Sequence, residues 1–367
     1  MRRIPARSNA RETTRSTAGS AARTAAPAPS RTPAPTHDRS RARFPARVPT
    51  ARSLVRLTAA TVLLTALAAL PGPAATARDL PGSYVVSRAP GVLPEGIAIT
   101  PDGTMYVSSD GTGALYRGRV GTPDMKPFPA RGLDDRPSAL GVHTDRRGRI
   151  LSVGGATLTV HDRHGRLLAT RTAPGGPLGT PDLNDLAVTD DAVYVTDWAN
   201  PVILRAKIRG GVLGPLEPWL DIRPAFPQFP ARYWLLNGIV ANASGTALLV
   251  ASNGTEAVWR IGTADRDVSR LDLGEESFGP DGMVLRGRTL YAVLNYGAPH
   301  GVYIARLDEE LRSGTVTHRL TDGPFDLPTT LAWHGCRLYV VNSQLDDPPG
   351  LPPYTVSAIA DPTCGPA

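Results

Sequence analysis

An internal repeat of roughly 45 residues constrains the fold of this chain more than any other feature of the sequence. Each copy has a small or polar residue, an alternating apolar segment, a tight turn and a second alternating segment. The copies begin 44, 45, 53, 44 and 48 positions apart and occupy residues 95–109, 139–153, 184–197, 237–252, 281–295 and 329–342. Alternation with period 2 around turns such as Asp102-Gly103 and Ser244-Gly245 is typical of β-hairpins.

The stretches between the copies predict further strands, so that each unit has about four. Examples are residues 114–120, 158–165, 203–208, 257–262 and 301–307. Four strands in every 40–50 residues, repeated along the chain, are the signature of a β-propeller. We therefore expect an all-β, six-bladed β-propeller with four-stranded antiparallel blades.

The two ends of the repeat region suggest how the ring closes. Residues 83–88 precede the first copy and residues 354–359 follow the sixth. Both segments are expected to join the last blade, because pairing them there covers strand edges that would otherwise be exposed. A Cys336–Cys364 disulfide would pin this closure, since an exported chain permits one. A metal-binding or catalytic cysteine pair, with His334 nearby, is the alternative.

The N-terminal region has the features of a secretory leader. Residues 1–50 are rich in Arg, Ala, Pro, Ser and Thr, and an apolar run follows at 57–70. Ala75-Thr76-Ala77 supplies a small-residue cleavage pattern. The run spans only about 21 Å as a helix, short of a ~30 Å hydrocarbon core, so we expect no stable membrane span. We expect 1–77 to be a disordered extension plus signal, cleaved near Ala77, and 78–367 to be one secreted propeller domain. A lipid- or membrane-tethered form is the alternative.

The charge distribution argues against a nucleic-acid partner, although the whole chain has a pI near 9.7. Residues 1–77 hold 13 of the 40 basic residues and two of the 33 acidic ones, which leaves 27 basic and 31 acidic residues in the remainder. The basic character therefore belongs to the leader. A monomer acting on a small molecule is the simplest expectation for the acidic remainder.

The residues that begin the six copies form a candidate site. In a propeller the first strand of each blade lines the central channel, so these residues converge at one channel mouth. They are Glu95, Ala139, Asn184, Asn237, Asp281 and Thr329. Two carboxylates and two amides offer hard oxygen donors, which suit Ca²⁺, Mg²⁺ or Mn²⁺, and two carboxylates neutralise one divalent cation. Alternatively, Asn and Asp before glycine are simple turn formers.

Four short motifs resemble the senescence marker protein/gluconolactonase family, whose relatives include diisopropyl fluorophosphatase and the paraoxonases. In chain order they are Pro94-Glu95-Gly96, Leu183-Asn184-Asp185, Leu236-Asn237-Gly238 and Pro280-Asp281-Gly282. The resemblance, over about residues 83–360, implies that Glu95, Asn184, Asn237 and Asp281 bind a catalytic divalent metal, most readily calcium. The family's arginine that holds sugar lactones has no certain counterpart, although Arg131 and Arg136 are loose candidates.

The same resemblance implies a hydrolase acting on a lactone, ester or phosphoester. Asp281 is the expected base or nucleophile, and Glu95 is expected chiefly to hold the metal. Four further residues are candidates for substrate contact: His143, Trp234, Tyr296 and His300. For His143 a structural role is the alternative to proton transfer, and the aromatic segment before Asn237 is either a binding wall or packing.

Two other functions compete with hydrolysis. A non-catalytic propeller, stabilised by its metal, could serve as a ligand- or protein-binding module. A lyase-type or synthase-type propeller would carry metal-free chemistry in the channel. The lyase-type class should lack the set of two carboxylates and two amides.

Overall fold

The computed structural model describes residues 80–129, 136–274, 278–296, 299–345 and 350–365. The predicted leader, its apolar run and the cleavage site at Ala77 lie outside these ranges. The described residues form 24 β-strands and two short 3₁₀ turns, Arg223–Ala225 and Ala231–Tyr233. The all-β prediction is therefore confirmed. In this part of the chain no helix has the length and apolar character needed to cross a membrane.

Four sheets contain four antiparallel strands each, in sequence order. The first consists of β6 (Val142–Thr144), β7 (Ile150–Gly154), β8 (Thr157–His161) and β9 (Leu167–Thr172). The second consists of β10 (Leu183–Val188), β11 (Ala192–Asp197), β12 (Val202–Arg209) and β13 (Val212–Asp221). The third consists of β14 (Leu236–Ala241), β15 (Ala247–Ser252), β16 (Ala257–Gly262) and β17 (Val268–Arg270). The fourth consists of β18 (Met283–Arg286), β19 (Thr289–Leu294), β20 (Gly301–Leu307) and β21 (Gly314–Leu320).

The fifth sheet has eight strands in the order β2-β3-β4-β5-β1-β24-β23-β22. Its first half is β2 (Pro94–Ile99), β3 (Thr104–Ser109), β4 (Leu115–Arg119) and β5 (Thr122–Phe128). Its second half is β1 (Ser83–Ser87), β24 (Tyr354–Ala360), β23 (Arg337–Asn342) and β22 (Pro328–His334). A single parallel pair, Val85 with Asp124, joins the halves, whereas β1 and β24 pair antiparallel over several residues. Cys336, in the turn after β22, forms a disulfide with Cys364 just after β24.

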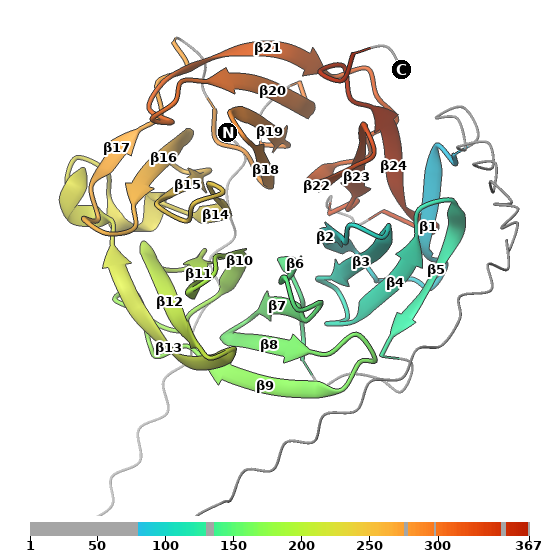
Figure 1. The fold of residues 1–367 in the computed structure, drawn as a ribbon, viewed down its shortest axis with the longest axis horizontal. Coiled ribbons are helices and arrows are strands. Elements are labelled where there is room, and N and C mark those ends of the chain that lie inside the picture. Colours follow the sequence, from blue (N-terminus) through green and yellow to red (C-terminus); the bar gives the residue numbers. More distant parts are fainter. Residues whose placement is uncertain (1–79, 130–135, 275–277, 297–298, 346–349, 366–367) are drawn as a thin grey trace, which may run out of the picture. The chain divides into compact units, whose positions relative to one another are not determined.

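The sheets are arranged around a common centre, with β2, β6, β10, β14, β18 and β22 innermost (Figure 1). Six apolar clusters of described residues lie between neighbouring sheets or, in one case, between the halves of the eight-stranded sheet. The second strands are covered on both faces, so β11 and β15 are buried along their whole length. The outer strand β21 alternates between more and less exposed residues. This arrangement is typical of face-to-face packed sheets, in which burial is deepest near the middle.

The innermost strands approach one another closely, and glycine makes this possible. Each of them contacts the innermost strand of the next sheet. Gly238 donates its backbone N–H to the carbonyl oxygen of Asp281 at 2.9 Å, and this bond connects two neighbouring sheets. A Cβ atom at this position would lie 2.3 Å from that same carbonyl oxygen. The glycine of the Asn-Gly motif therefore serves packing between sheets rather than a turn.

Gly238→Ala is expected to lower the free energy of unfolding by about 2–3 kcal/mol, because one of two backbone segments must move to admit the methyl group. Gly175→Ala is the matched control, since a Cβ at Gly175 would meet nothing within 4 Å. Chemical denaturation of both variants measures the difference. Equal stability of the two variants would contradict this account of the inner strands.

Candidate metal centre

A shared irregularity lies at the start of several inner strands, where the sequence predicts the site. The pairing of β2 with β3 shifts register between Pro94 and Ile97, and β10, β14 and β22 shift at the equivalent position. Leu93 and Leu235, two residues before Glu95 and Asn237, have left-handed φ values of 45° and 44°. Bulges of this kind change the direction in which a side chain points and are common beside functional sites.

The four predicted ligands come together in the structure. They line one small cavity between the inner strands, together with Gly96, Gly141, Gly282 and Thr330. Their exposed fractions are 7% for Glu95, 8% for Asn184, 2% for Asn237 and 4% for Asp281. Asn237 lies within β14 rather than at a turn, and Asp281 lies two residues before β18. Turn formation therefore does not explain Asn237, whereas Asp281 and Gly282 form a bend that leads into β18.

The other two repeat positions are structural. Ala139 is fully buried. Thr329 donates its hydroxyl to the backbone carbonyl oxygen of Glu95 at 2.8 Å, which ties the last copy of the repeat to the first. The repeat therefore supplies four polar side chains to the cavity and two buried residues with structural roles.

Among the described residues, the two buried carboxylates have no cationic partner. Burial raises the pKa of Glu95 well above its usual value, and the charges of Asp281, Asp185 and Asp110 raise it further. Burial also raises the pKa of Asp281 to about 7, although hydrogen bonds from Asn295 and Asn237 act in the opposite direction. No Arg, Lys or His in the described ranges forms an ion pair with either carboxylate. Buried anions without a counter-charge are costly, so this cavity favours a cation.

Two further amides, which were not among the predicted site residues, position the cluster. Asn295 donates from Nδ2 to Asp281 Oδ2 at 2.5 Å. Asn253 accepts a hydrogen bond from Asn237 Nδ2 at 2.8 Å and donates to the carbonyl oxygens of Gly279 and Pro280. Both residues directly follow a second strand of their sheet. A polar residue recurring at that repeat position was the signal that could have revealed them.

Unpartnered oxygen atoms indicate that the cavity fits a hard cation. The side-chain oxygens of Asn184 and Asn295 are buried without a hydrogen-bond partner in the described structure. Buried polar atoms rarely lack a hydrogen-bond partner, so both amide oxygens are suited to coordinate a cation. No group of three or more His, Cys, Asp and Glu side chains forms a metal site within the described residues. A site here must therefore combine amide oxygens with the two carboxylates, as Ca²⁺ and Mg²⁺ sites often do.

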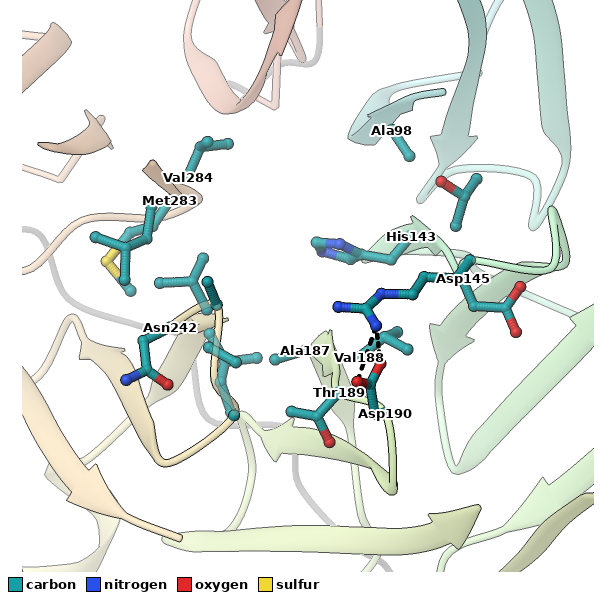
Figure 2. Close-up of a pocket in the computed structure, with 18 of the residues that line it drawn as sticks. Ala98, His143, Asp145, Ala187, Val188, Thr189, Asp190, Asn242, Met283 and Val284 are labelled. Atoms are coloured by element: carbon teal, nitrogen blue, oxygen red, sulfur yellow. Dashed lines mark hydrogen bonds and ion pairs between the residues drawn. The ribbon is translucent and has the colours of Figure 1, made fainter. Parts of the chain in front are cut away.

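The channel widens beyond the cluster into a cavity of about 1120 Å³. His143 and Ile97 line both spaces. Figure 2 shows His143 pointing into the larger cavity, and its Nε2 lies 3.3 Å from Asp185 Oδ1. Asp185 also accepts the backbone N–H of Ile239 at 3.1 Å. His143 is thus a channel-lining residue held by a carboxylate, at the boundary between the cluster cavity and the larger one.

The aromatic segment before Asn237 is mainly packing. Trp234 is fully buried and lies 5.1 Å, between ring centroids, from Trp259. Phe226 and Phe229 pack on the same apolar cluster, which also contains Trp219, whereas Tyr233 is exposed. Trp234 therefore occupies a core position, which does not fit the contact with substrate that the sequence suggested. The sequence of the segment does not reveal this inward packing, because two short 3₁₀ turns decide which way the aromatic rings point.

The remaining candidates for contact with the substrate differ in their exposure and in their partners. Tyr296 is exposed in part, yet desolvation of its hydroxyl and the charges of Asp281 and Glu95 raise its pKa. His300 is exposed shortly before β20. Arg136 is buried and donates to the hydroxyls of Ser152 and Thr159 at 2.8 and 2.9 Å. Arg131 lies outside the described residues.

Comparison with known proteins identifies the fold but no family. No protein-family model matches the chain, and no curated protein matches it. Among solved structures, a gluconolactonase from Xanthomonas campestris is 18% identical with a TM-score of 0.52, covering 76% of this chain and 89% of its own. The Malassezia sympodialis allergen Mala s 1 is 14% identical with a TM-score of 0.55, covering 77% and 97%.

A virginiamycin B lyase from Staphylococcus aureus is 14% identical with a TM-score of 0.51, covering 75% of this chain and 82% of its own. Identities this low show a shared fold only, and that fold serves both a lactonase and a lyase. The chain is therefore a propeller-like all-β protein of the architecture shared by gluconolactonase and virginiamycin B lyase.

Proposed function

We propose that this protein is a divalent-metal-dependent hydrolase that acts on a lactone, ester or phosphoester at the mouth of its central channel. One observation carries the proposal. Glu95 and Asp281 are buried together without a cationic partner in the described chain, beside an amide oxygen of Asn184 that has no partner. A divalent cation, most readily Ca²⁺ with Mg²⁺ or Mn²⁺ as alternatives, would neutralise both carboxylates and use the free oxygen.

The architecture behind the proposal is a six-bladed propeller over residues 78–367. Six interfaces between neighbouring sheets support that number, with one of them between the halves of the eight-stranded sheet. In this interpretation β1 joins β22, β23 and β24 as the outer strand of the last blade, and the β1–β24 pairing supports that closure. The single Val85–Asp124 pair is then a contact between two blades.

The chain's own groups divide the chemistry between them. Glu95, Asn184, Asn237 and Asp281 would hold the cation, which when bound polarises a carbonyl or phosphoryl oxygen and stabilises its developing charge. Asp281 acts on the reacting centre, either as the base that takes a proton from water or as the nucleophile. The amides of Asn295 and Asn237 hold its carboxylate in one orientation. Asn253 fixes the amide of Asn237 and so acts only through that residue.

A non-catalytic binding propeller remains the second candidate. The observation in its favour is that the four ligands come from four different sheets, so a cation would tie those sheets together. In that case metal removal changes stability alone. A metal-free lyase is less well supported, because its channel would have no use for two buried carboxylates without a counter-charge.

Metal analysis followed by a substrate panel tests the proposal. The purified protein is expected to contain close to one divalent cation per chain and to hydrolyse a lactone, an aryl ester or a phosphotriester. Chelation should abolish that turnover, and Ca²⁺, Mg²⁺ or Mn²⁺ should restore it. Bound metal without hydrolysis of any of the three substrate types would favour the binding module instead.

Export is part of the same proposal. We expect the protein in the culture medium to begin near Arg78, after cleavage at Ala77. N-terminal sequencing of the secreted form tests this expectation. Recovery in the membrane fraction with an intact leader would favour the tethered form.

A further inference from the structure

Two aromatic rings from different sheets meet at the end of the channel that holds the cluster. Trp198 directly follows β11 and Tyr296 follows β19, and their ring centroids lie 6.1 Å apart at an interplanar angle of 31°. The sheet of β14–β17 separates these two strands in the ring (Figure 1). The rings therefore reach toward each other across a neighbouring sheet. Tyr296 directly follows Asn295, whose amide donates to Asp281 Oδ2, so the backbone of Tyr296 lies beside the cluster.

Two carboxylates that the proposed chemistry does not use lie in the same region. Asp182 accepts the backbone N–H of Trp198 through its carbonyl oxygen at 2.8 Å, so these two residues are neighbours. Asp110 directly follows Ser109, which pairs with Pro94 beside Glu95. Asp182 directly precedes Leu183, which begins β10 and pairs with Asp197. Both carboxylates therefore belong to the end of the inner strands that holds the cluster. Neither Asp110 nor Asp182 forms an ion pair within the described residues.

Nearby Asp197 differs, because several donors satisfy its carboxylate. They are the backbone N–H groups of Asp182, Ala199 and Asn200 and the side-chain amide of Asn200. These neutral donors hold the Asp197 carboxylate in place without cancelling its charge, so Asp197 contributes negative potential alongside Asp110 and Asp182. Arg136, a loose candidate for the family's arginine that holds sugar lactones, donates to Ser152, Thr159 and the carbonyl oxygen of Gly113.

The balance of charge at this end of the channel stays negative even with a metal bound. One divalent cation would offset Glu95 and Asp281, which leaves Asp110, Asp182 and Asp197 without an ion-pair partner among the described residues. Aromatic faces beside carboxylates are the surroundings in which proteins bind organic ammonium groups. The unpartnered oxygen of Asn184, two residues after Asp182, marks the neighbouring cavity as a ligand site, which the proposed cation would occupy.

We propose that Trp198, Tyr296, Asp110 and Asp182 bind a cationic ammonium group of the substrate, so that the protein prefers cationic esters or lactones over neutral ones and rejects anionic ones. The preference for a particular substrate class rests on the proposed hydrolase function. The binding of the ammonium group itself does not, because it needs no turnover. Local negative potential raises the concentration of cations at the mouth and lowers that of anions.

Three probes of the same shape test the proposal on the metal-loaded protein by isothermal titration calorimetry. They are choline, its neutral isostere 3,3-dimethyl-1-butanol, and the anion 3,3-dimethylbutanoate. Choline is expected to bind about tenfold more tightly than the alcohol, and the anion more weakly than either. The double variant Asp110→Asn/Asp182→Asn should remove most of the preference for choline, and Trp198→Leu should weaken choline binding.

Asp190→Asn is the matched control, because it removes one carboxylate at the opposite end of β10, where Asp190 pairs with Arg146. This variant should keep the full preference for choline. Absence of choline binding, or equal binding of choline and the alcohol, overturns the proposal. Turnover of neutral esters without choline binding overturns this inference alone, whereas choline binding without any turnover supports it and overturns the hydrolase.

Discussion

Asp281→Asn is expected to lower kcat/KM by about a thousandfold or more while the protein remains folded. The amide has nearly the same shape as the carboxylate, but it cannot take a proton, attack as a nucleophile or neutralise a cation. Because the carboxylate is buried and its pKa is raised to about 7, its removal also relieves an unfavourable charge in the metal-free protein. We therefore expect the metal-free variant to be at least as stable as the metal-free wild type.

Steady-state kinetics on the best substrate of the panel, with thermal unfolding as the check on folding, measure both effects. The exposed ion-pair residue Asp190 again supplies the control, and Asp190→Asn should retain wild-type turnover. A folded Asp281→Asn protein with undiminished kcat/KM would remove Asp281 from the chemistry. Loss of folding in this variant would contradict the conclusion that the buried Asp281 carboxylate is unfavourable in the metal-free protein.

Addition of Ca²⁺ is expected to raise Tm by about 5–10 °C at pH 8 and by much less at pH 5. The sign follows from the raised pKa values of Glu95 and Asp281. Unfolded carboxyl groups titrate near pH 4, so between about pH 4 and 7 the folded protein binds more protons than the unfolded one. The stabilisation from the protonated forms is fully present below about pH 4 and is lost as pH rises through about 7.

A cation can replace those protons, and this is why its effect grows with pH. The carboxylates must lose their protons before they bind metal, so the affinity for Ca²⁺ should fall at least severalfold for each pH unit below about 7. Thermal unfolding with and without Ca²⁺ across this range measures the difference. Asp281→Asn should flatten the dependence on pH, whereas an equal Ca²⁺ effect at pH 5 and pH 8 would locate the cation elsewhere.

Much of the fold follows from local patterns in the sequence. The six copies of the repeat begin at or next to the innermost strands, and the predicted segments 83–88 and 354–359 match two strands that pair with each other. Alternation and turn residues act over a few positions, so they can be recognised without knowledge of the rest of the chain. The same repeat position supplied Glu95, Asn184, Asn237 and Asp281, which meet in one cavity.

Other features depend on neighbours that are distant in sequence. Trp234 was a candidate for substrate contact, yet it packs against Trp259, because an aromatic-rich segment has no period that shows which way its rings turn. Asn295 and Asn253 became part of the site only through their hydrogen bonds to Asp281 and Asn237. The meeting of Trp198 with Tyr296 joins two sheets that the repeat pattern treats separately.

The repeat by itself determined that this protein consists of β-strand units with polar residues at the start of their inner strands. Such information is local, since it consists of side-chain alternation and of the residues that permit turns. Only the tertiary structure decided that Glu95 and Asp281 are buried together with no counter-charge from the described part of the chain, and that burial raises the pKa of both carboxyl groups. Burial and Coulomb interactions depend on distances between sheets, and those distances exist only once the chain has folded.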